Sequence, residues 1–220
     1  MAGIIKVLLA DDHQIVREGL RSLLKACRDC EIVGEAADGR KAVALVEELK
    51  PDIVILDISM PLLNGLEATR QILKMRPQTK VLILTMHESD SLVRDILNVG
   101  ARGYILKTDV GKDLVTAVES LHRKKTFFTS SVSQMVLDGY LKGSGSRSSN
   151  SDSEGTRLTP RQREVVQLVA EGKSSKEVAV ALDLSVKTAE THRTNIMHRL
   201  GLHSVAELVR YAVRNEIIQA

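Results

Sequence analysis

Apolar runs and helical spacing alternate along the first half of the chain. Short apolar runs predict five strands, at Ile4–Ala10, Ile32–Val33, Ile53–Leu56, Val81–Leu84 and Gly103–Leu106. Four of these runs are continuously apolar rather than alternating, which is typical of strands covered on both faces. Each run is followed by a segment whose apolar residues recur at helical spacing. Five such units predict an α/β domain, a doubly wound five-stranded parallel sheet with right-handed crossovers and helices on both faces.

A segment without any apolar residue divides the chain. It reads GSGSRSSNSDSEG over residues 143–155. Because this composition buries too little apolar surface to order itself, it predicts a flexible linker. Just before the linker, apolar residues at helical spacing predict a short connecting helix at Ser131–Leu141.

The last part of the chain has the pattern of four helices, at Pro160–Glu171, Ser175–Leu182, Val186–Leu200 and Val205–Asn215. Three residue pairs predict capping boxes at helix starts: Thr159 with Gln162, Ser174 with Glu177, and Ser204 with Glu207. Gly172 and Gly201 are suited to end helices in the left-handed conformation. Only Asp183–Ser185 separates the middle two helices, which indicates a helix-turn-helix. We therefore expect a sheet domain at residues 1–124, a connection at 125–155, and a small all-α helix-turn-helix domain at 156–220.

Composition sets limits on this picture. Hydrophobic residues make up 43% of the 220 residues, so a sizeable core can be buried, and with aromatic residues at 2% that core must be aliphatic. No apolar run has the length of a membrane span and the N-terminus lacks the pattern of a signal peptide, so we expect a cytoplasmic protein. The net charge of +3 is too small to demand a nucleic-acid partner. The mild basic bias lies in Thr156–Ala220, which has ten Lys or Arg against seven Asp or Glu.

Cys27 and Cys30 have a C-x-x-C spacing that allows two interpretations. One is a redox or metal role. The other is packing, with Cys27 continuing the apolar face of the preceding helix and Cys30 just beyond its end. Since no second cysteine pair completes a four-ligand zinc site, the pattern favours packing and leaves a redox role open.

Polar side chains follow four of the predicted strands. Asp11 and Asp12 come after the first strand, Asp57 after the third, Thr85 after the fourth and Lys107 after the fifth. In doubly wound sheets the carboxyl ends of the strands form the ligand crevice, at the point where the strand order reverses. Residues far apart in the sequence are therefore expected to converge there.

The chemistry of these five side chains is mutually consistent. Three carboxylates in one crevice repel one another, and a hard cation such as Mg²⁺, bound through oxygen, would relieve that repulsion. A carboxylate can also attack phosphorus and form an aspartyl phosphate. Lys107 and Thr85 supply an ammonium and a hydroxyl for the phosphoryl oxygens. Each residue alone has an ordinary interpretation, such as Asp12 capping the next helix, so the combination carries the specificity.

These residues resemble a known family. Asp11-Asp12, the segment Asp57–Gly65 (DISMPLLNG), Thr85 and Tyr104–Lys107 resemble the receiver domain of bacterial response regulators, over about residues 4–123. The resemblance implies a flavodoxin-like fold in which Asp57 accepts a phosphoryl group from a histidine kinase. It also implies that Asp11, Asp12, Asp57 and the Ser59 carbonyl bind Mg²⁺, and that Thr85 and Tyr104 act as a switch pair. Many receivers have a cis proline after the lysine; here Thr108 stands there, and the isomer of the Lys107–Thr108 bond stays open.

The predicted helix Val186–Leu200 has two different sides. Ala189, Ile196 and Leu200 form an apolar side, and polar residues occupy another, a pattern that can enter a major groove. The surrounding sequence, residues 156–217, resembles the LuxR-type helix-turn-helix, although Ala189 stands where the family often has Val. The resemblance implies DNA contacts by six residues of this helix: Lys187, Thr188, Glu190, Thr191, Arg193 and Thr194.

Taken whole, the chain is similar to NarL/FixJ-type transcriptional regulators. The expected function is regulation of transcription by sequence-specific DNA binding, controlled by phosphorylation, and not that of an enzyme. The expected partners are a histidine kinase, double-stranded DNA and, when phosphorylated, a second copy of the chain, but no membrane. Two alternatives remain: an aspartyl phosphatase-like hydrolase, and a protein-interaction adaptor that binds no DNA. Such a hydrolase generally needs a nearby acid, and Asp57-Ile58-Ser59 offers none two residues on.

Overall fold

The computed structural model describes residues 3–86, 89–129, 132, 158–215 and 217–218. The chain divides into two compact units, Met1–Asp138 and Gly139–Ala220. The expected linker at 143–155 and all of the expected connecting helix except Val132 lie outside the described residues. Among the helices of the described ranges, none combines the length and the hydropathy of a membrane span.

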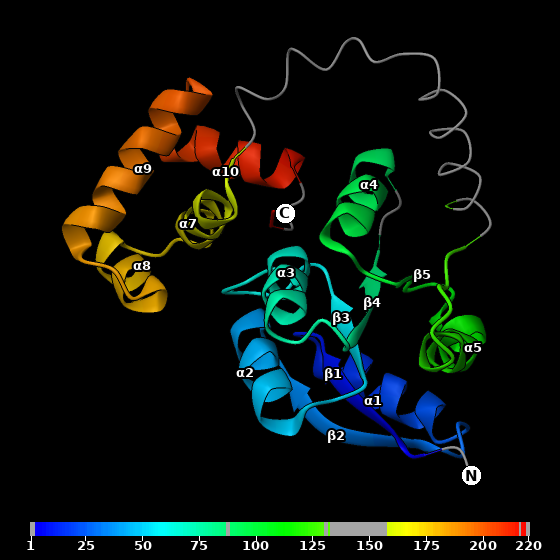
Figure 1. The fold of residues 1–220 in the computed structure, drawn as a ribbon. Helices are drawn as coiled ribbons and strands as arrows, with labels where there is room; N and C mark the ends of the chain where they lie inside the picture. The colour runs from blue at the N-terminus through cyan, green and yellow to red at the C-terminus, as the bar shows by residue number, and fades with distance from the viewer. Residues whose placement is uncertain (1–2, 87–88, 130–131, 133–157, 216, 219–220) are drawn as a thin grey trace. The chain divides into compact units, whose positions relative to one another are not determined.

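The first unit is built on one five-stranded parallel sheet (Figure 1). Its strands are β1 (Ile5–Ala10), β2 (Cys30–Ala36), β3 (Ile53–Asp57), β4 (Lys80–Thr85) and β5 (Gly103–Leu106). Their order in the sheet is β2-β1-β3-β4-β5, so the direction of chain progress reverses between β1 and β3. The predicted doubly wound α/β fold is confirmed.

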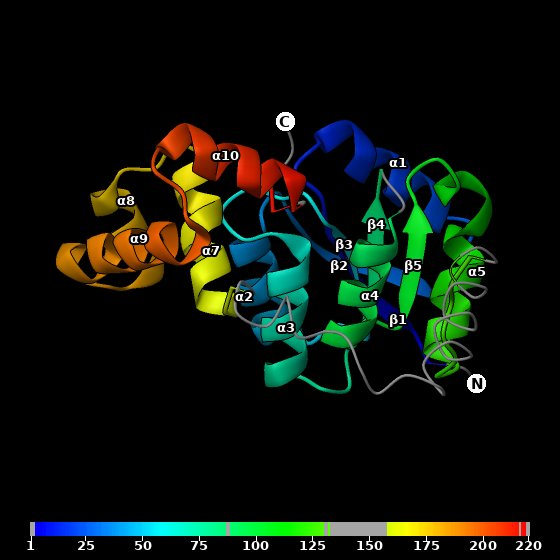
Figure 2. The ribbon, with the colours of Figure 1, turned by 90° about the horizontal axis from the view of Figure 1, so that it is seen from above.

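Helices cover both faces of the sheet, as the near-continuous burial of the strands requires (Figures 1 and 2). One face packs against α1 (Gln14–Leu24) and α5 (Val110–His122). The other face packs against α2 (Gly39–Leu49), α3 (Gly65–Met75) and α4 (Asp90–Val99). Two aliphatic core clusters result, one on each side of the sheet.

Strand β2 is longer than the sequence pattern predicts. Only Ile32–Val33 form an apolar run, whereas the strand extends over Cys30–Ala36. It lies at an edge of the sheet and pairs with β1 alone, with a register shift between Val7 and Leu8. Because most of its positions are only half-buried, polar residues such as Glu35 are tolerated there. These polar residues interrupt the apolar run from which a strand is predicted.

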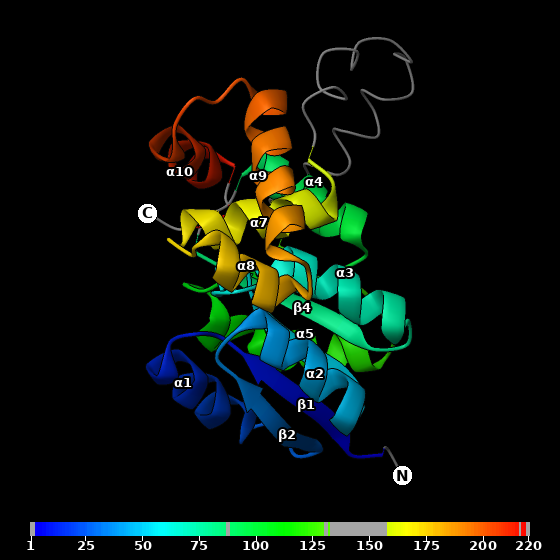
Figure 3. The ribbon, with the colours of Figure 1, turned by 90° about the vertical axis from the view of Figure 1, so that its left-hand side faces the viewer.

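The described residues of the second unit form α7 (Pro160–Ala170), α8 (Ser175–Leu182), α9 (Val186–Leu200) and α10 (Val205–Arg214). Figure 3 shows α8 and α9, which pack against each other and are joined by the short turn at Asp183–Ser185. The predicted helix-turn-helix is therefore present. Gly172 and Gly201 have φ values of 83° and 64°, the left-handed conformation expected after a helix.

Two of the three predicted capping boxes form. Thr159 with Gln162, and Ser174 with Glu177, each exchange both hydrogen bonds. At the third, the Ser204 side chain accepts from the Glu207 amide, but the Glu207 carboxylate accepts from the amide of His203, at 2.7 Å, in place of Ser204. The prediction of a reciprocal capping box at Ser204 was therefore wrong, because the second bond forms to the amide one residue earlier, at His203.

Candidate functional site

The carboxyl edge of the sheet brings Asp11, Asp57 and Lys107 into contact. The Lys107 Nζ lies 2.7 Å from Asp11 Oδ2 and 3.0 Å from Asp57 Oδ1. Asp11 is fully buried and Asp57 is 1% exposed, so two carboxylates share one ammonium away from bulk water. These three residues therefore lie close together, as their positions at the ends of parallel strands predict.

Neighbouring strands hold these side chains in register. Asp57 is the last residue of β3, and the following amide, Ile58 N, donates to the Leu84 carbonyl at the end of β4. Lys107 follows β5, and its amide donates to the Thr85 carbonyl at 2.8 Å. Asp11 follows β1, which lies beside β3 at the reversal of strand order, the usual place for a ligand site.

Burial and charge act together on this cluster. Burial raises the pKa of Asp57, and the neighbouring Asp11 raises it further, while Lys107 opposes both. Burial lowers the pKa of Lys107, but the bonds and charges of Asp11 and Asp57 outweigh burial and leave that pKa raised. Asp57 Oδ2 is buried and has no hydrogen-bond donor among the described residues. The site therefore has two carboxylates for one ammonium, and one buried carboxylate oxygen accepts no hydrogen bond from the described residues. A further cation or an electrophilic group could bind there.

Asp12 and His13 extend the acidic cluster toward the surface. The His13 Nδ1 lies 2.8 Å from Asp12 Oδ1, and the His13 amide donates to Asp11 Oδ1 at 2.9 Å. Ligand atoms of Asp11, Asp12 and His13 all lie within 4.8 Å of one another, a grouping that could hold a metal ion. His13 rather than Asp12 stands at the start of α1, without a side-chain cap, so the capping interpretation of Asp12 is wrong. Sequence reasoning missed His13, although its position directly after Asp11-Asp12 was visible.

Thr85 and Tyr104 lie on neighbouring strands, with Tyr104 opposite Ile83, two residues before Thr85. Thr85 ends β4 and is 4% exposed, and Tyr104, in β5, is 1% exposed within the core beside α2, α3 and α4. Tyr104 is thus oriented inward in this structure. Ser59, two residues beyond Asp57, is half-buried. The Lys107–Thr108 peptide bond is trans, like every other peptide bond in the described segments.

The structure joins Cys27 and Cys30 in a disulfide, with 5.4 Å between their Cα atoms. Cys27 is buried, as the packing interpretation expects, but it lies beyond the end of α1 at Leu24 rather than on the apolar face of that helix, and Cys30 begins β2. That interpretation did not include a bond between the two side chains.

The six residues expected to contact DNA are all exposed on α9. Ala189 and Ile196, on the opposite side of the helix, are buried against the rest of the second unit, which fixes the polar side outward. Ser185 caps the helix through the Thr188 amide, and the Thr191 hydroxyl donates to the Lys187 carbonyl at 2.8 Å. The arrangement presents two cations, a carboxylate and three hydroxyls from one helix face, which suits a nucleic-acid groove.

Sequence comparisons match both units to known families. The response regulator receiver domain matches residues 7–119, and the luxR family of bacterial regulatory proteins matches residues 156–212. The chain belongs to the response regulators. The oxygen regulatory protein NreC of Staphylococcus aureus (strain MRSA252) is 37% identical to this response regulator over 216 residues, 98% of this chain and 100% of NreC.

Solved structures of similar proteins agree with this assignment. A LuxR-family two-component response regulator from Aurantimonas sp. SI85-9A1 is 33% identical, with a TM-score of 0.60 over 63% of this chain and 99% of that one. RcsB from Salmonella enterica serovar Typhimurium, bound to promoter rprA in the presence of the phosphomimetic BeF₃⁻, is 27% identical. Its TM-score is 0.61, over 95% of this chain and 98% of RcsB. The response regulator described here is thus a transcriptional regulator with a receiver and a LuxR-type DNA-binding domain.

Proposed function

We propose that this response regulator accepts a phosphoryl group on Asp57 from a histidine kinase and thereby controls its binding to double-stranded DNA. The observation that carries the proposal is the pair of buried carboxylates, Asp11 and Asp57, on either side of the Lys107 ammonium. A carboxylate oxygen of Asp57 would attack the phosphorus, and the bond from phosphorus to the histidine nitrogen of the kinase would break, with that nitrogen as the leaving atom. We place the phosphoacceptor domain at residues 1–124, the connection at 125–155 and the DNA-binding domain at 156–220.

Each neighbour of Asp57 has a role in this proposal. Asp11, Asp12, Asp57 and the Ser59 carbonyl would hold Mg²⁺, for which their hard oxygen donors are suited. Bound Mg²⁺ supplies positive charge to the transferring phosphoryl group. Lys107 is charged and already within reach of Asp57, so it can bind a phosphoryl oxygen without a large movement.

Thr85 and Tyr104 form the proposed switch. The Thr85 hydroxyl would move toward the phosphoryl oxygens, and the inward orientation of Tyr104 would become the favoured one. Because Tyr104 is already buried, phosphorylation would act by stabilising an orientation that the chain reaches without it. The altered surface beside α4 and β5 would then favour a homodimer, as fits a protein that reads two half-sites on DNA.

Phosphotransfer is tested by labelling the protein with radioactive acetyl phosphate and Mg²⁺. We expect Asp57→Asn to abolish labelling, because it removes the nucleophilic oxygen. Asp29→Asn, an exposed acid at the amino end of β2, is the matched control and should label like the wild type. Undiminished labelling of Asp57→Asn would exclude Asp57 as the acceptor, and sustained turnover of a phosphate ester would favour the hydrolase alternative.

DNA binding is proposed to run through α9. Lys187 and Arg193 would contact phosphates, so Lys187→Ala and Arg193→Ala should weaken binding to all sequences and flatten its salt dependence. Thr188, Glu190, Thr191 and Thr194 would face base edges, and changes there should alter preference among sites. Arg28→Ala, which removes one exposed positive charge from the other unit, is the control. If all the α9 variants bind DNA like the wild type, α9 is not the DNA-reading helix, whereas a wild-type protein that binds no DNA at low salt would favour the protein-interaction adaptor.

Coupling between the two domains is tested on the full-length protein. RcsB dimers bound to DNA have been solved, and we expect the phosphorylated form of this chain to bind DNA in the same stoichiometry. Acetyl phosphate with Mg²⁺ should raise both the affinity for selected genomic fragments and the sedimentation coefficient. If neither quantity changes, phosphorylation does not control this regulator through association. We also propose a cytoplasmic location, as fits the roles proposed for both domains.

A further inference from the structure

Arg17 connects the helix α1 to the peptide that carries the acidic cluster. Its Nη1 donates to the carbonyl oxygen of Asp11 at 2.7 Å, and its side chain is only 15% exposed. The guanidinium therefore contacts the backbone of Asp11 rather than its carboxylate. Because the Asp11 carbonyl belongs to the peptide group between Asp11 and Asp12, this bond bears on the orientation of both residues.

The same peptide segment is fixed from the sheet side. The Asp11 amide donates to the carbonyl of Ala36, the last residue of β2, at 3.2 Å. The backbone of Asp11 is thus held at its N–H by β2 and at its carbonyl by α1. Such double anchoring limits the rotation of the peptide groups on either side of Asp11, and so limits the directions in which the Asp11 and Asp12 side chains leave the backbone.

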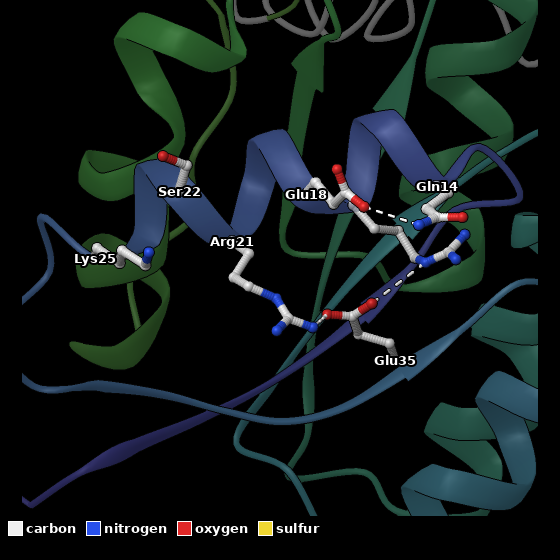
Figure 4. Close-up of a pocket in the computed structure, with 7 residues that line it drawn as sticks. Gln14, Glu18, Arg21, Ser22, Lys25 and Glu35 are labelled. Carbon is white, nitrogen blue, oxygen red and sulfur yellow. Dashed lines mark hydrogen bonds and ion pairs between the residues drawn. The ribbon is translucent and has the colours of Figure 1, made fainter.

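Glu35, on β2, orients the guanidinium. Its Oε2 lies 3.4 Å from the Arg17 Nε, and its Oε1 is paired with Arg21, one helical turn farther along α1. Figure 4 shows the Glu35 carboxylate reaching toward α1, with a dashed line to Arg21. Glu35 is opposite Leu9 in the register of β1 and β2, so it is placed by the sheet and not by a loop.

This ion-pair cluster lies at the surface rather than in the apolar core. It borders a hollow of about 260 Å³ between α1 and β2 whose lining also includes Gln14, Glu18, Ser22 and Lys25 (Figure 4). Water can therefore fill the space that a shorter side chain at position 17 would leave. A change at Arg17 should thus affect the Asp11 backbone without opening a cavity in the core.

We propose that Arg17 is a positioning residue for the cation site, and that Glu35 acts on that site through Arg17. Neither residue is a ligand: Arg17 fixes the Asp11–Asp12 peptide so that their carboxylates face one ion, and Glu35 holds the guanidinium in the orientation that makes this bond. The inference rests on the Mg²⁺ site of the proposed function.

Mg²⁺ affinity of the full-length, unphosphorylated protein is the decisive measurement, made by calorimetric titration with MgCl₂. Loss of a residue that orients a metal ligand typically weakens binding 10- to 100-fold, and here the contact is to a backbone carbonyl, so we expect Arg17→Gln to weaken Mg²⁺ binding roughly tenfold. Glu35→Gln should weaken it in the same direction by a smaller factor. The double variant should be no weaker than Arg17→Gln, because Glu35 has no separate route to the site.

Lys25→Gln is the matched control, since it removes the same charge from the lining of the same hollow. It should bind Mg²⁺ like the wild type. Urea unfolding without Mg²⁺ supplies a second readout, in which Arg17→Gln and Lys25→Gln should have similar midpoints. A merely structural role for Arg17 would shift the unfolding midpoint and leave the Mg²⁺ affinity unchanged.

The outcomes separate this inference from the proposed function. If the wild type binds Mg²⁺ and Arg17→Gln binds it equally well, Arg17 does not position the site and the inference is overturned. If the wild type binds no Mg²⁺, the metal part of the proposed function fails first, and this inference fails with it. Should Arg17→Gln not fold, Glu35→Gln decides the matter, and an unchanged Mg²⁺ affinity in that variant rejects the proposal.

Discussion

The backbone of Asp57 is in close contact with the start of α3, and Gly65 makes that contact possible. A Cβ added at Gly65 would lie 2.3 Å from the Asp57 carbonyl oxygen and 2.9 Å from the Ile58 Cα. The Gly65 amide also donates to the Ile58 carbonyl at 2.8 Å. Both obstructing atoms belong to the backbone, so no side-chain rotation can relieve the clash. The variant Gly65→Ala must therefore push β3 and α3 apart.

The size of the expected effect follows from these distances. Real Cβ contacts essentially never fall under 3.0 Å, so the 2.3 Å approach must lengthen by roughly 0.7 Å or more. Overpacking of this kind costs about 1–3 kcal/mol in free energy of unfolding. A misplacement on the order of 1 Å at a reacting group can cost up to about 100-fold in rate, and we expect at least about a tenfold slower phosphorylation of Gly65→Ala.

Two assays check this prediction. Urea denaturation gives the free energy of unfolding, and labelling by acetyl phosphate at fixed Mg²⁺ gives the phosphorylation rate. Gly19→Ala, in the exposed middle of α1, is the control because its added Cβ meets nothing within 4 Å. That variant should gain about 0.5–1 kcal/mol of stability and label like the wild type. If Gly65→Ala behaves like Gly19→Ala in both assays, close packing at α3 does not fix Asp57 and the reasoning fails.

Three further predictions concern stability. Burial raises the pKa of Asp57 in the folded state above its unfolded value, so its ionisation opposes folding once the pH exceeds the unfolded pKa. Asp57→Asn should therefore be more stable than the wild type at pH 7 without Mg²⁺, and the difference should shrink as the pH falls toward 4, as urea titrations at several pH values would show. Reduction of the Cys27–Cys30 disulfide should lower the free energy of unfolding by about 2 kcal/mol, the value for so short a closed loop, and Cys30→Ser should not respond to reductant. Thr159→Ala removes the cap and its reciprocal bond at the start of α7 and should cost about 1 kcal/mol in thermal or urea unfolding.

The sequence predicts those features of the fold that depend on burial and local chemistry. Strands β1, β3 and β4 are buried on both faces, so their apolar runs have little ambiguity. Helix starts in the second unit are equally explicit, because Thr159 and Ser174 bond to amides only three residues away. The convergence of Asp11, Asp57 and Lys107 follows from the topology alone, since parallel strands end at one edge.

Other features depend on three-dimensional relationships that no local pattern encodes. The edge strand β2 is obscured by its half-buried polar positions, Glu35 among them. The contact between Arg17 and the Asp11 carbonyl requires α1 to pack at one particular position along β1. The spacing of apolar residues in the sequence does not reveal that position. The role of Gly65 is likewise invisible in sequence, because it arises from the distance between a helix start and the backbone of another strand. The Cys27–Cys30 bond depends on a turn geometry that the spacing merely permits.

The side-chain caps of the second unit bear on the order in which the two units fold. Thr159, Ser174, Ser185 and Ser204 each bond an amide within their own helix, so all four helices have local start signals. Short-range helical contacts generally form in microseconds to milliseconds, whereas a parallel sheet must first close long loops between strands that are far apart in the chain. The folding of the DNA-binding unit should therefore be the faster of the two. On refolding of the full-length chain from urea, the DNA-reading helix should form before the five-stranded sheet is complete.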